Sequence, residues 1–206
     1  VLKEISDKMP KNSCVTTDVG QHQMWAAQHM SFQDPCNFLT SGGMGTMGFG
    51  LPAAMGVQLA FPDEVVVCVT GEGSIQMNIQ ELSTCLQYGI PVKILCLNNG
   101  SLGMVRQWQE LFYEDRKSGV DLEGNPDFVK LAESFGIKGF NLRRPGDVKR
   151  VLQNALDYNE GPCLINCEVE KTDNVFPMIP AGAALTEMLI DEPSPKIKLA
   201  KPTGST

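Results

Sequence analysis

The feature that most constrains the fold is an alternation of short apolar runs with segments of helical period. VVVCVT at residues 65–70 and VKILCLNN at residues 92–99 are apolar, rich in β-branched residues and without alternating polar positions, as are strands buried on both faces of a parallel sheet. Between them, IQELSTCLQYG at residues 79–89 predicts a helix in which Ile79, Leu82 and Leu86 share one face and Gly89 ends the helix.

The alternation continues on both sides of this unit. LPAAMGVQLA predicts an earlier helix that tolerates Pro52 in its first turn. Later, PDFVKLAESFG, KGFNLR, GDVKRVLQNALDY and PCLINCEVE predict a helix, a strand, a helix and a strand. The predicted fold is therefore α/β, a doubly wound and mostly parallel sheet with helices on both faces. We expect residues 1–190 to form this domain and the Pro-, Lys- and Ser-rich residues 191–206 to form a flexible tail.

Composition limits the compartment and the partners. The formal net charge of -7 argues against nucleic-acid and membrane surfaces, since both favour basic patches. No apolar run approaches the roughly 20 residues that cross a bilayer. The seven cysteines include no C-x-x-C pair, and Cys68, Cys85 and Cys96 lie in apolar segments, as small core residues do. Cys163 and Cys167 are expected to share one face of a strand. Together these features indicate reduced thiols and a cytoplasmic location, or an organellar one in a eukaryote. The chain begins with valine, and we expect it to be a fragment or a processed form.

A glycine-rich loop, SGGMGTMGFG at residues 41–50, contains the G-x-G-x-x-G pattern of a dinucleotide-binding turn. That fingerprint needs a strand before it, a helix after it and an acid at the end of the next strand. A helix follows, but the strand before the loop is only a short CNFLT, and Asp63 and Glu64 precede the next strand instead of ending it. NAD is therefore not expected. The loop either contributes to another diphosphate site or is a tight turn that packs a helix onto the sheet.

A second group of polar residues follows two of the predicted strands. GEGSIQMN comes directly after VVVCVT, and LNNGSLGM ends the next strand. Ligands of α/β sheets bind at the carboxyl ends of such strands. Gly71 and Gly73 allow close backbone approach, while Glu72 and Asn99 offer oxygen ligands suited to Mg²⁺ held together with substrate phosphates. A helix expected to begin near Ile75 presents free amides to a phosphate.

These motifs resemble the diphosphate–metal motif of thiamine-diphosphate enzymes, G-D-G followed by N-N. Further stretches resemble the catalytic subunit of the acetolactate (acetohydroxyacid) synthase family, and these are VGQHQMWAAQ, TSGGMGTMGFGLPAA, MNIQELSTCLQYGIPVKILCLNN, GMVRQWQELFYE and PDFVKLAESFG. The likeness runs from about Cys14 to Leu189 and corresponds to the C-terminal, diphosphate-binding domain of that subunit. It implies thiamine diphosphate and Mg²⁺ as cofactors. The family's N-terminal pyrimidine-binding domain and central FAD-associated domain are not in the chain, so FAD is expected only in the complete enzyme.

The resemblance also implies which residues form the site. The implied metal ligands are the side chains of Glu72 and Asn99 and the backbone carbonyl of Ser101. The implied cofactor-binding residues are Val19, Gly20, Gln21, His22, Gly45, Met47, Gly71, Glu72, Gly73, Ser74, Asn99, Ser101, Gly103, Met104 and Val105.

Two residues are implied to act in catalysis. Met47 is the bulky residue that holds the cofactor bent, which brings its pyrimidine amino group towards the thiazolium C2 proton. Trp108, with Val105, maps to the mouth of the site, where the second keto acid is selected. The segment from Gly103 to about Gly124 resembles the mobile loop of the family.

Ordinary structural roles compete with these assignments. Ordinary polar surface or a satisfied core position is an alternative for His22 and His29, although the motif around His22 favours a ligand contact. Gap-filling core residues are an alternative for Met24, Met44 and Met47, of which only Met47 is favoured as a site residue. Trp108 is also explained by a helix-face anchor, and Arg106, Arg116 and Lys117 by solvated surface charges.

The chain departs from the family pattern at two places. The family has Asp where this chain has Glu72. Because Mg²⁺ demands near-ideal distances of about 2.0–2.1 Å, the extra methylene must shift the loop, place a water between carboxylate and metal, or weaken binding. In IPAGAAL, Ala183 replaces the second glycine of the family's I-P-x-G-G segment, which changes a local turn.

The resemblance implies a reaction and a set of partners. Pyruvate loses carbon dioxide, and the two-carbon unit adds to a second 2-keto acid, pyruvate or 2-ketobutyrate, in branched-chain amino acid biosynthesis. The carboxylate that activates the pyrimidine ring comes from the N-terminal domain of a partner subunit, so the chain alone is expected to bind the cofactor without turnover. The implied partners are 2-keto acid substrates, the missing N-terminal and central domains, further copies in a homodimer or higher homo-oligomer, and a small regulatory subunit.

Two alternatives stay open. One is a domain of a different thiamine-diphosphate carboligase or decarboxylase. The other is a non-catalytic assembly module of the same fold, which has lost metal binding through Glu72.

Overall fold

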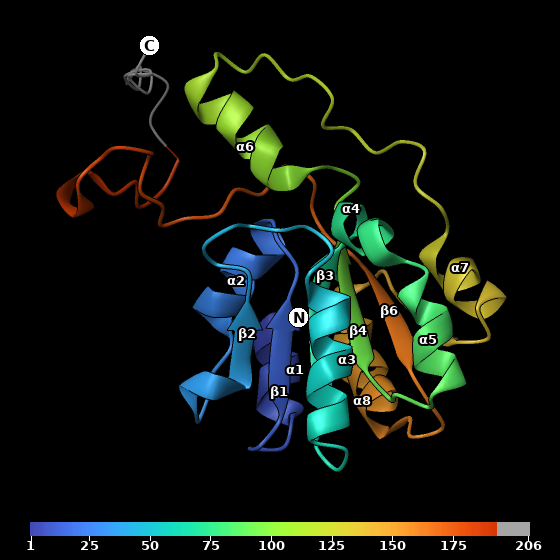
Figure 1. Ribbon diagram of the computed structural model, residues 1–206. Helices are drawn as coiled ribbons and strands as arrows, with labels where there is room; N and C mark the ends of the chain where they lie inside the picture. The colour runs from blue at the N-terminus through green and yellow to red at the C-terminus, as the bar shows by residue number, and fades with distance from the viewer. Residues whose placement is uncertain (193–206) are drawn as a thin grey trace.

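The computed structural model describes residues 1–192. Their centre is a six-stranded sheet with the order β2-β1-β3-β4-β6-β5 (Figure 1), in which all paired strands run parallel. The strands are β1 (Cys14–Thr17), β2 (Phe38–Thr40), β3 (Val66–Gly71), β4 (Lys93–Asn98), β5 (Lys138–Leu142) and β6 (Cys163–Glu168). The helices are α1 (Leu2–Lys8), α2 (Gln21–His29), α3 (Gly50–Ala60), α4 (Glu72–Ile75), α5 (Glu81–Gln87), α6 (Gly103–Phe112), α7 (Phe128–Ser134) and α8 (Val148–Asp157). Short 3₁₀ turns lie at Pro35–Asn37, Gln76–Asn78, Pro145–Asp147 and Leu185–Glu187. The predicted α/β fold is confirmed.

Helices cover both faces of the sheet because its strands are apolar on both sides. On β3, Val66 and Cys68 face the core shared with α3, α5 and α7. The alternate residues Val67 and Val69 face the core shared with α1, α2 and α8. The continuous apolar runs in the sequence therefore reflect burial on two faces, as the parallel arrangement requires.

The cysteines behave largely as the sequence indicates. Cys68, Cys85 and Cys96 lie in one core, and Cys163 and Cys167 share the other. All seven are free thiols, and they all fall within residues 1–192. No helix in this part of the chain is long and apolar enough to cross a membrane.

Two predicted details are corrected, the burial of Leu86 and the start of the helix near Ile75. Leu86 is 46% exposed, whereas Leu82 and Cys85 are fully buried, because the i, i+3 pair faces the sheet and Leu86 lies at the margin of that face beside Gly136. The helix expected near Ile75 begins at Glu72, directly after β3. The segment likened to a mobile loop begins with the ten-residue helix α6. Of the tail predicted at residues 191–206, residues 193–206 lie outside the described residues.

The strand order creates a crevice between β1 and β3. From β1 the chain passes through α2 to β2 at one edge, whereas from β3 it passes to β4 in the opposite direction. The loops that follow β1 and β3 therefore diverge at the carboxyl end of the sheet. This is the switch point at which open α/β sheets bind ligands.

Candidate functional site

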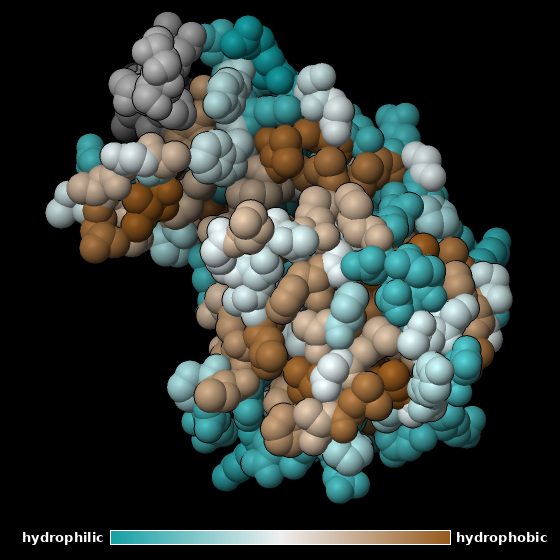
Figure 2. Space-filling view, viewed as in Figure 1, coloured by the Kyte–Doolittle hydropathy of each residue, from teal (hydrophilic) through white to brown (hydrophobic). Residues whose placement is uncertain are grey.

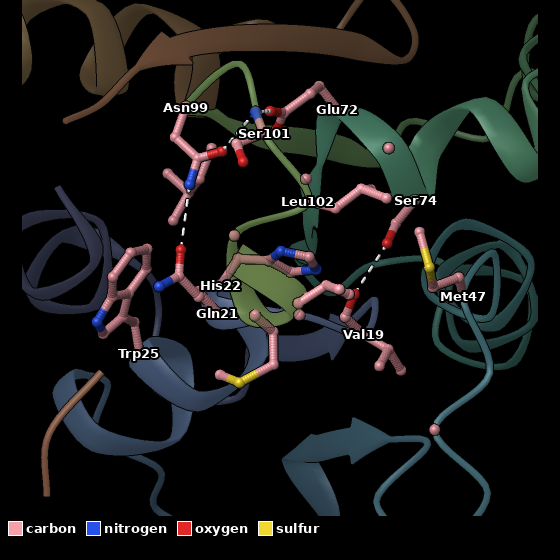
Figure 3. A pocket seen from close by; sticks show the side chains of 18 residues that line it. Val19, Gln21, His22, Trp25, Met47, Glu72, Ser74, Asn99, Ser101 and Leu102 are labelled. Atoms are coloured by element: carbon pink, nitrogen blue, oxygen red, sulfur yellow. Dashed lines mark hydrogen bonds between the residues drawn. The ribbon is translucent and has the colours of Figure 1, made fainter. Parts of the chain in front are cut away.

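A pocket of about 220 Å³ opens at this switch point (Figure 3). Its walls come from the loop after β1, the start of α2, the glycine loop, the start of α4, the loop after β4 and the start of α6. The lining residues are Val19, Gly20, Gln21, His22, Trp25, Gly45, Met47, Gly71, Glu72, Gly73, Ser74, Leu97, Asn99, Ser101, Leu102, Gly103, Met104 and Val105. Every residue that the sequence assigns to the cofactor is among them. Their individual roles towards a ligand stay predictions.

Three lining residues, Trp25, Leu97 and Leu102, are absent from the prediction. Trp25 carried a usable signal, because it lies four residues after Gln21 and therefore on the same face of α2. Leu97 and Leu102 flank the Asn-Asn turn and are recognisable as wall residues only once the pocket is seen.

Two oxygen-bearing side chains meet at the backbone amide of Ser101. This amide donates to Glu72 Oε1 at 2.7 Å and to Asn99 Oδ1 at 3.0 Å. The two side chains meet because β3 and β4 are hydrogen-bonded neighbours, with Gly71 in register with Leu97. The sequence spacing thus brings a carboxylate and an amide oxygen to one place at the edge of the sheet.

Glu72 is only 2% exposed. Burial raises the pKa of its carboxyl group, while hydrogen bonds from its own amide and from the amides of residues 99–101 partly oppose this increase. The backbone therefore holds the carboxylate in place before any ligand arrives. Within residues 1–192, no three His, Cys, Asp or Glu side chains form a metal cluster. A cation at this edge would be coordinated by one carboxylate together with amide, carbonyl and ligand oxygens, which is the manner of Mg²⁺ at phosphate sites.

His22 supplies a second sign of a ligand. Its imidazole packs against bare backbone, since a Cβ at Gly20 or at Gly71 would lie 2.8 Å from the ring. Burial lowers the pKa of His22 to about 4, against a smaller opposing effect of the Asp18 backbone. Its Nε2 is buried and has no hydrogen-bond partner. Because buried polar atoms are nearly always paired, this orphan nitrogen in the wall of the pocket fits a polar ligand atom.

Asp18, which the sequence analysis did not identify, holds the glycine loop in place. This fully buried carboxylate accepts hydrogen bonds from the amide of Gly48 at 2.6 Å and from the hydroxyl of Thr70 at 3.2 Å. Burial raises the pKa of Asp18, and these hydrogen bonds moderate the increase. Asp18 was missed because β1 is too short to be recognised as a strand from its sequence.

The glycine loop is a tight turn that packs a helix onto the sheet, and two of its residues, Gly45 and Met47, also line the pocket. Gly48 has a positive φ of 89°, and a Cβ at Gly50 would lie 2.8 Å from the Asp18 amide. These glycines therefore permit the tight packing of α3 onto the sheet. The same turn directs Met47 into the pocket wall, whereas Met44 is 89% exposed.

Trp108 is the one predicted site residue that lies elsewhere. It lines a neighbouring groove on α6 with Val105, Gln109, Tyr113 and Arg116. Its ring makes an edge contact with Phe112, with centroids 5.4 Å apart. Val105 lines both the groove and the pocket.

Arg106 was expected to be a solvated charge, and this is wrong. It is 2% exposed and forms an ion pair with Glu110 at 2.8 Å. It also donates to the carbonyl of Asp173 at 2.8 Å and to the side chain of Asn174 at 3.0 Å. One turn of α6 places Arg106 over the segment that follows β6, which removes it from solvent.

A pocket at the switch point, lined by close-packed glycines, a buried histidine nitrogen without a partner and two side-chain oxygens, defines the class, an α/β domain with a ligand pocket at the carboxyl end of its sheet. Residues 18–167 match the family model "Thiamine pyrophosphate enzyme, C-terminal TPP binding domain". The chain belongs to this family.

Within this family, the chain is similar to several acetolactate synthase large subunits. The chain is 51% identical to the acetolactate synthase isozyme 2 large subunit of Escherichia coli (strain K12), over 92% of the chain and 34% of that protein. It is 52% identical to the acetolactate synthase large subunit of Haemophilus influenzae (strain ATCC 51907 / DSM 11121 / KW20 / Rd), over 87% of the chain and 31% of that protein. The corresponding protein of Pyropia yezoensis is 46% identical over 100% of the chain and 33% of its own length. The chain thus spans about a third of the length of these relatives.

Proposed function

We propose that the chain is the thiamine-diphosphate-binding domain, residues 1–190, of an acetolactate synthase large subunit. The observation that carries this proposal is the meeting of Glu72 and Asn99 in the same pocket as the unpartnered nitrogen of His22. It occurs in a chain about half identical to several proteins of that name.

In this proposal, different residues of the pocket contact different parts of the cofactor. Glu72, Asn99 and the carbonyl of Ser101 would hold Mg²⁺, and His22 would contact the diphosphate. Gly73 leaves room at the start of α4, where a Cβ would lie 2.7 Å from Leu102. The glycine loop positions the Met47 side chain against the remainder of the cofactor. When bound, thiamine diphosphate would supply a nucleophilic carbon for keto-acid chemistry, and the chain's own part would be to bind, orient and shield that group.

The complete enzyme has more parts than this domain. In the proposed assembly, N-terminal and central domains supply the activating carboxylate and the FAD site, and 2-keto acids are the substrates. The names of the relatives call them large subunits, and we propose a small regulatory subunit as a further partner. Apolar surface lies along α6 and over α3 (Figure 2), including Val105, Leu59 and Phe61, each 49% exposed or more. This surface supports contact with the other domains and with further copies.

A chimera tests the activity. This chain replaces the matching C-terminal third of the Escherichia coli isozyme 2 large subunit, and the product is assayed with pyruvate, thiamine diphosphate, FAD and Mg²⁺. We expect acetolactate from the chimera and none from the isolated chain. The same chimera with Glu72→Gln controls for activity that arises without the proposed metal site. A folded chimera that forms no acetolactate would overturn the assignment.

The chimera also separates the alternatives. Turnover of a different 2-keto acid pair in preference to pyruvate would favour another carboligase or decarboxylase. A folded chimera that binds neither thiamine diphosphate nor Mg²⁺ would favour the non-catalytic module.

A further inference from the structure

Three side-chain amides form a continuous hydrogen-bonded row that runs from the segment after β6 to the proposed metal site. Gln107 on α6 contacts Gln21 at the start of α2, and Gln21 contacts Asn99 in the loop after β4 (Figure 3 shows the last of these contacts). Gln107 and Gln21 are 0% and 3% exposed. Because a buried amide must satisfy both its oxygen and its nitrogen, the orientation of each member constrains the next.

At the end of this row farthest from the metal site, backbone groups fix the orientation of the Gln107 amide, because a backbone N–H can only donate and a backbone carbonyl can only accept. The amide of Val175 donates to Gln107 Oε1 at 2.8 Å, and Gln107 Nε2 donates to the carbonyl of Val175 at 2.9 Å. Gln107 therefore has one possible orientation, and it presents its oxygen to Gln21.

Gln21 is fixed in turn. Its Nε2 donates to Gln107 Oε1 at 3.1 Å and to the carbonyl of Asp173 at 2.9 Å. Both partners are acceptors, so the nitrogen of Gln21 must face them and its oxygen must face Asn99. Asn99 Nδ2 donates to that oxygen at 3.1 Å.

The orientation of Gln21 also determines which atom of Asn99 faces the proposed metal position. With Nδ2 turned towards Gln21, Asn99 directs Oδ1 to the side of Ser101 and Glu72. An amide coordinates a hard cation through its oxygen, so the opposite orientation would present a nitrogen that cannot serve. We propose that Gln21 is a positioning residue that orients the Asn99 amide for metal binding, under the control of residues 173–175. This role differs from the direct cofactor contact expected from the sequence, and it rests on the proposed function.

The test is the apparent affinity for Mn²⁺, measured by electron paramagnetic resonance of the free ion in the presence of saturating thiamine diphosphate. Gln21→Met preserves the length of the side chain and removes its hydrogen bonds. Loss of an orienting partner behind a metal ligand weakens metal binding by about 10–100-fold, and we expect at least tenfold here. Gln28→Met, at an exposed position of the same helix, is the matched control and should bind as the wild type does.

A double-variant cycle separates orientation from packing. A carboxylate presents oxygen whichever way it turns, so Gln21→Met should cost less than about twofold in Mn²⁺ affinity when combined with Asn99→Asp and compared with Asn99→Asp alone. A packing role for Gln21 would give the same loss in both backgrounds and would overturn the proposal.

Gly103→Ala gives an independent test if Gln21→Met fails to fold. A Cβ at Gly103 would lie 2.0 Å from Gln21 Oε1 and 2.8 Å from Asn99 Nδ2, so it separates the two amides. It should reproduce the loss of Mn²⁺ affinity, whereas Gly56→Ala, where a Cβ meets nothing within 4 Å, should not. If the wild type binds no Mn²⁺, the proposed function fails together with this inference. If it does bind and the variants bind equally well, this inference alone is overturned.

Discussion

At the scale of single residues, the site is built from polar groups that the fold buries before a ligand is present. His22, Glu72 and Asp18 are all less than 8% exposed. Burial disfavours the charged form of each, so it lowers the pKa of His22 and raises the pKa values of Glu72 and Asp18. Glu72 and Asp18 are compensated by backbone and hydroxyl donors, whereas His22 retains an unpartnered Nε2. The pocket is therefore preorganised, with part of its polar capacity left for the ligand.

The buried histidine makes stability depend on pH. Burial lowers the pKa of His22 from 6.5 to about 4, so between these values the unfolded chain binds a proton that the folded chain does not. The stabilisation is complete above pH 6.5 and is lost as the pH falls towards 4, by about 3 kcal/mol at about 1.4 kcal/mol per pH unit. His22→Gln should flatten this dependence in urea unfolding measured from pH 7 to 4.

The second histidine of the chain provides the control. His29 lies on the same helix and is exposed, and His29→Gln controls for the loss of an imidazole at the surface of that helix. Asp18 and Glu72, whose pKa values are raised, change stability in the opposite sense over an overlapping range. They contribute equally to wild type and variant, so the difference between the two curves isolates His22. Identical slopes for wild type and His22→Gln would contradict this account of the pocket.

Residue identities at the site were largely predictable, and the reason is local. Gly71, Glu72 and Asn99 follow strands with strong apolar runs, so their position at one edge of the sheet follows from the parallel arrangement. Asp18 was missed, and Arg106 was wrongly explained as a surface charge, because their roles are set by distant contacts. Their burial depends on partners far along the chain, Gly48 for the first and Asp173 for the second.

At the scale of elements, α6 and the segment after β6 behave as one unit above the carboxyl edge of the sheet. In Figure 1 the orange segment leaving β6 runs beneath α6. Arg106 and Gln107, adjacent residues of α6, are hydrogen-bonded to Asp173, Asn174 and Val175. Hydrogen bonds between residues more than 60 positions apart in the sequence thus hold α6, whose first turn forms part of the pocket wall.

Removing the buried guanidinium should loosen this unit without unfolding the domain. Arg106→Met removes charged donors whose hydrogen bonds contribute on the order of 2 kcal/mol, while the Asn174–Glu110 hydrogen bond remains. Hydrogen exchange should accelerate about thirtyfold in α6 and in residues 173–178, since about 1.4 kcal/mol corresponds to tenfold.

An exposed ion pair serves as the comparison for that variant. Arg150 of α8 pairs with Asp147, which ends the 3₁₀ turn directly before that helix, and the Arg150 side chain is 65% exposed. Such pairs contribute little, so Arg150→Met should leave exchange in its own helix nearly unchanged. Acceleration spread evenly over the whole sheet in Arg106→Met would show a global effect and would contradict a local role.

The elements were predictable where their period is strong. β3, β4, β6 and the helices α3, α7 and α8 follow from apolar runs or amphipathic stripes in the sequence. α6 was not anticipated, because its segment was likened to a mobile loop, and the helix is held by hydrogen bonds to the distant segment after β6. α4 begins one turn earlier than expected because the backbone turns into a helix immediately after Gly71.

At the scale of the whole molecule, the described chain is one doubly wound sheet with its site at the reversal of strand order. Proteins of the thiamine pyrophosphate enzyme family share the domain matched by residues 18–167, and the relatives named above are about three times as long as the chain. In the proposed function, this part of the chain binds the diphosphate of the cofactor through a metal held by Glu72 and Asn99.

Calorimetric titration of the chain with thiamine diphosphate tests that claim most directly. The wild type should bind the cofactor in the presence of Mg²⁺ and at least about tenfold more weakly when the metal is removed, since phosphate and carboxylate together hold the ion. Glu72→Gln in Mg²⁺ should match the metal-free wild type, while Glu160→Gln at an exposed position should match the wild type in Mg²⁺. Binding that is absent, or that is equally strong without Mg²⁺ and without the Glu72 carboxylate, would contradict the account.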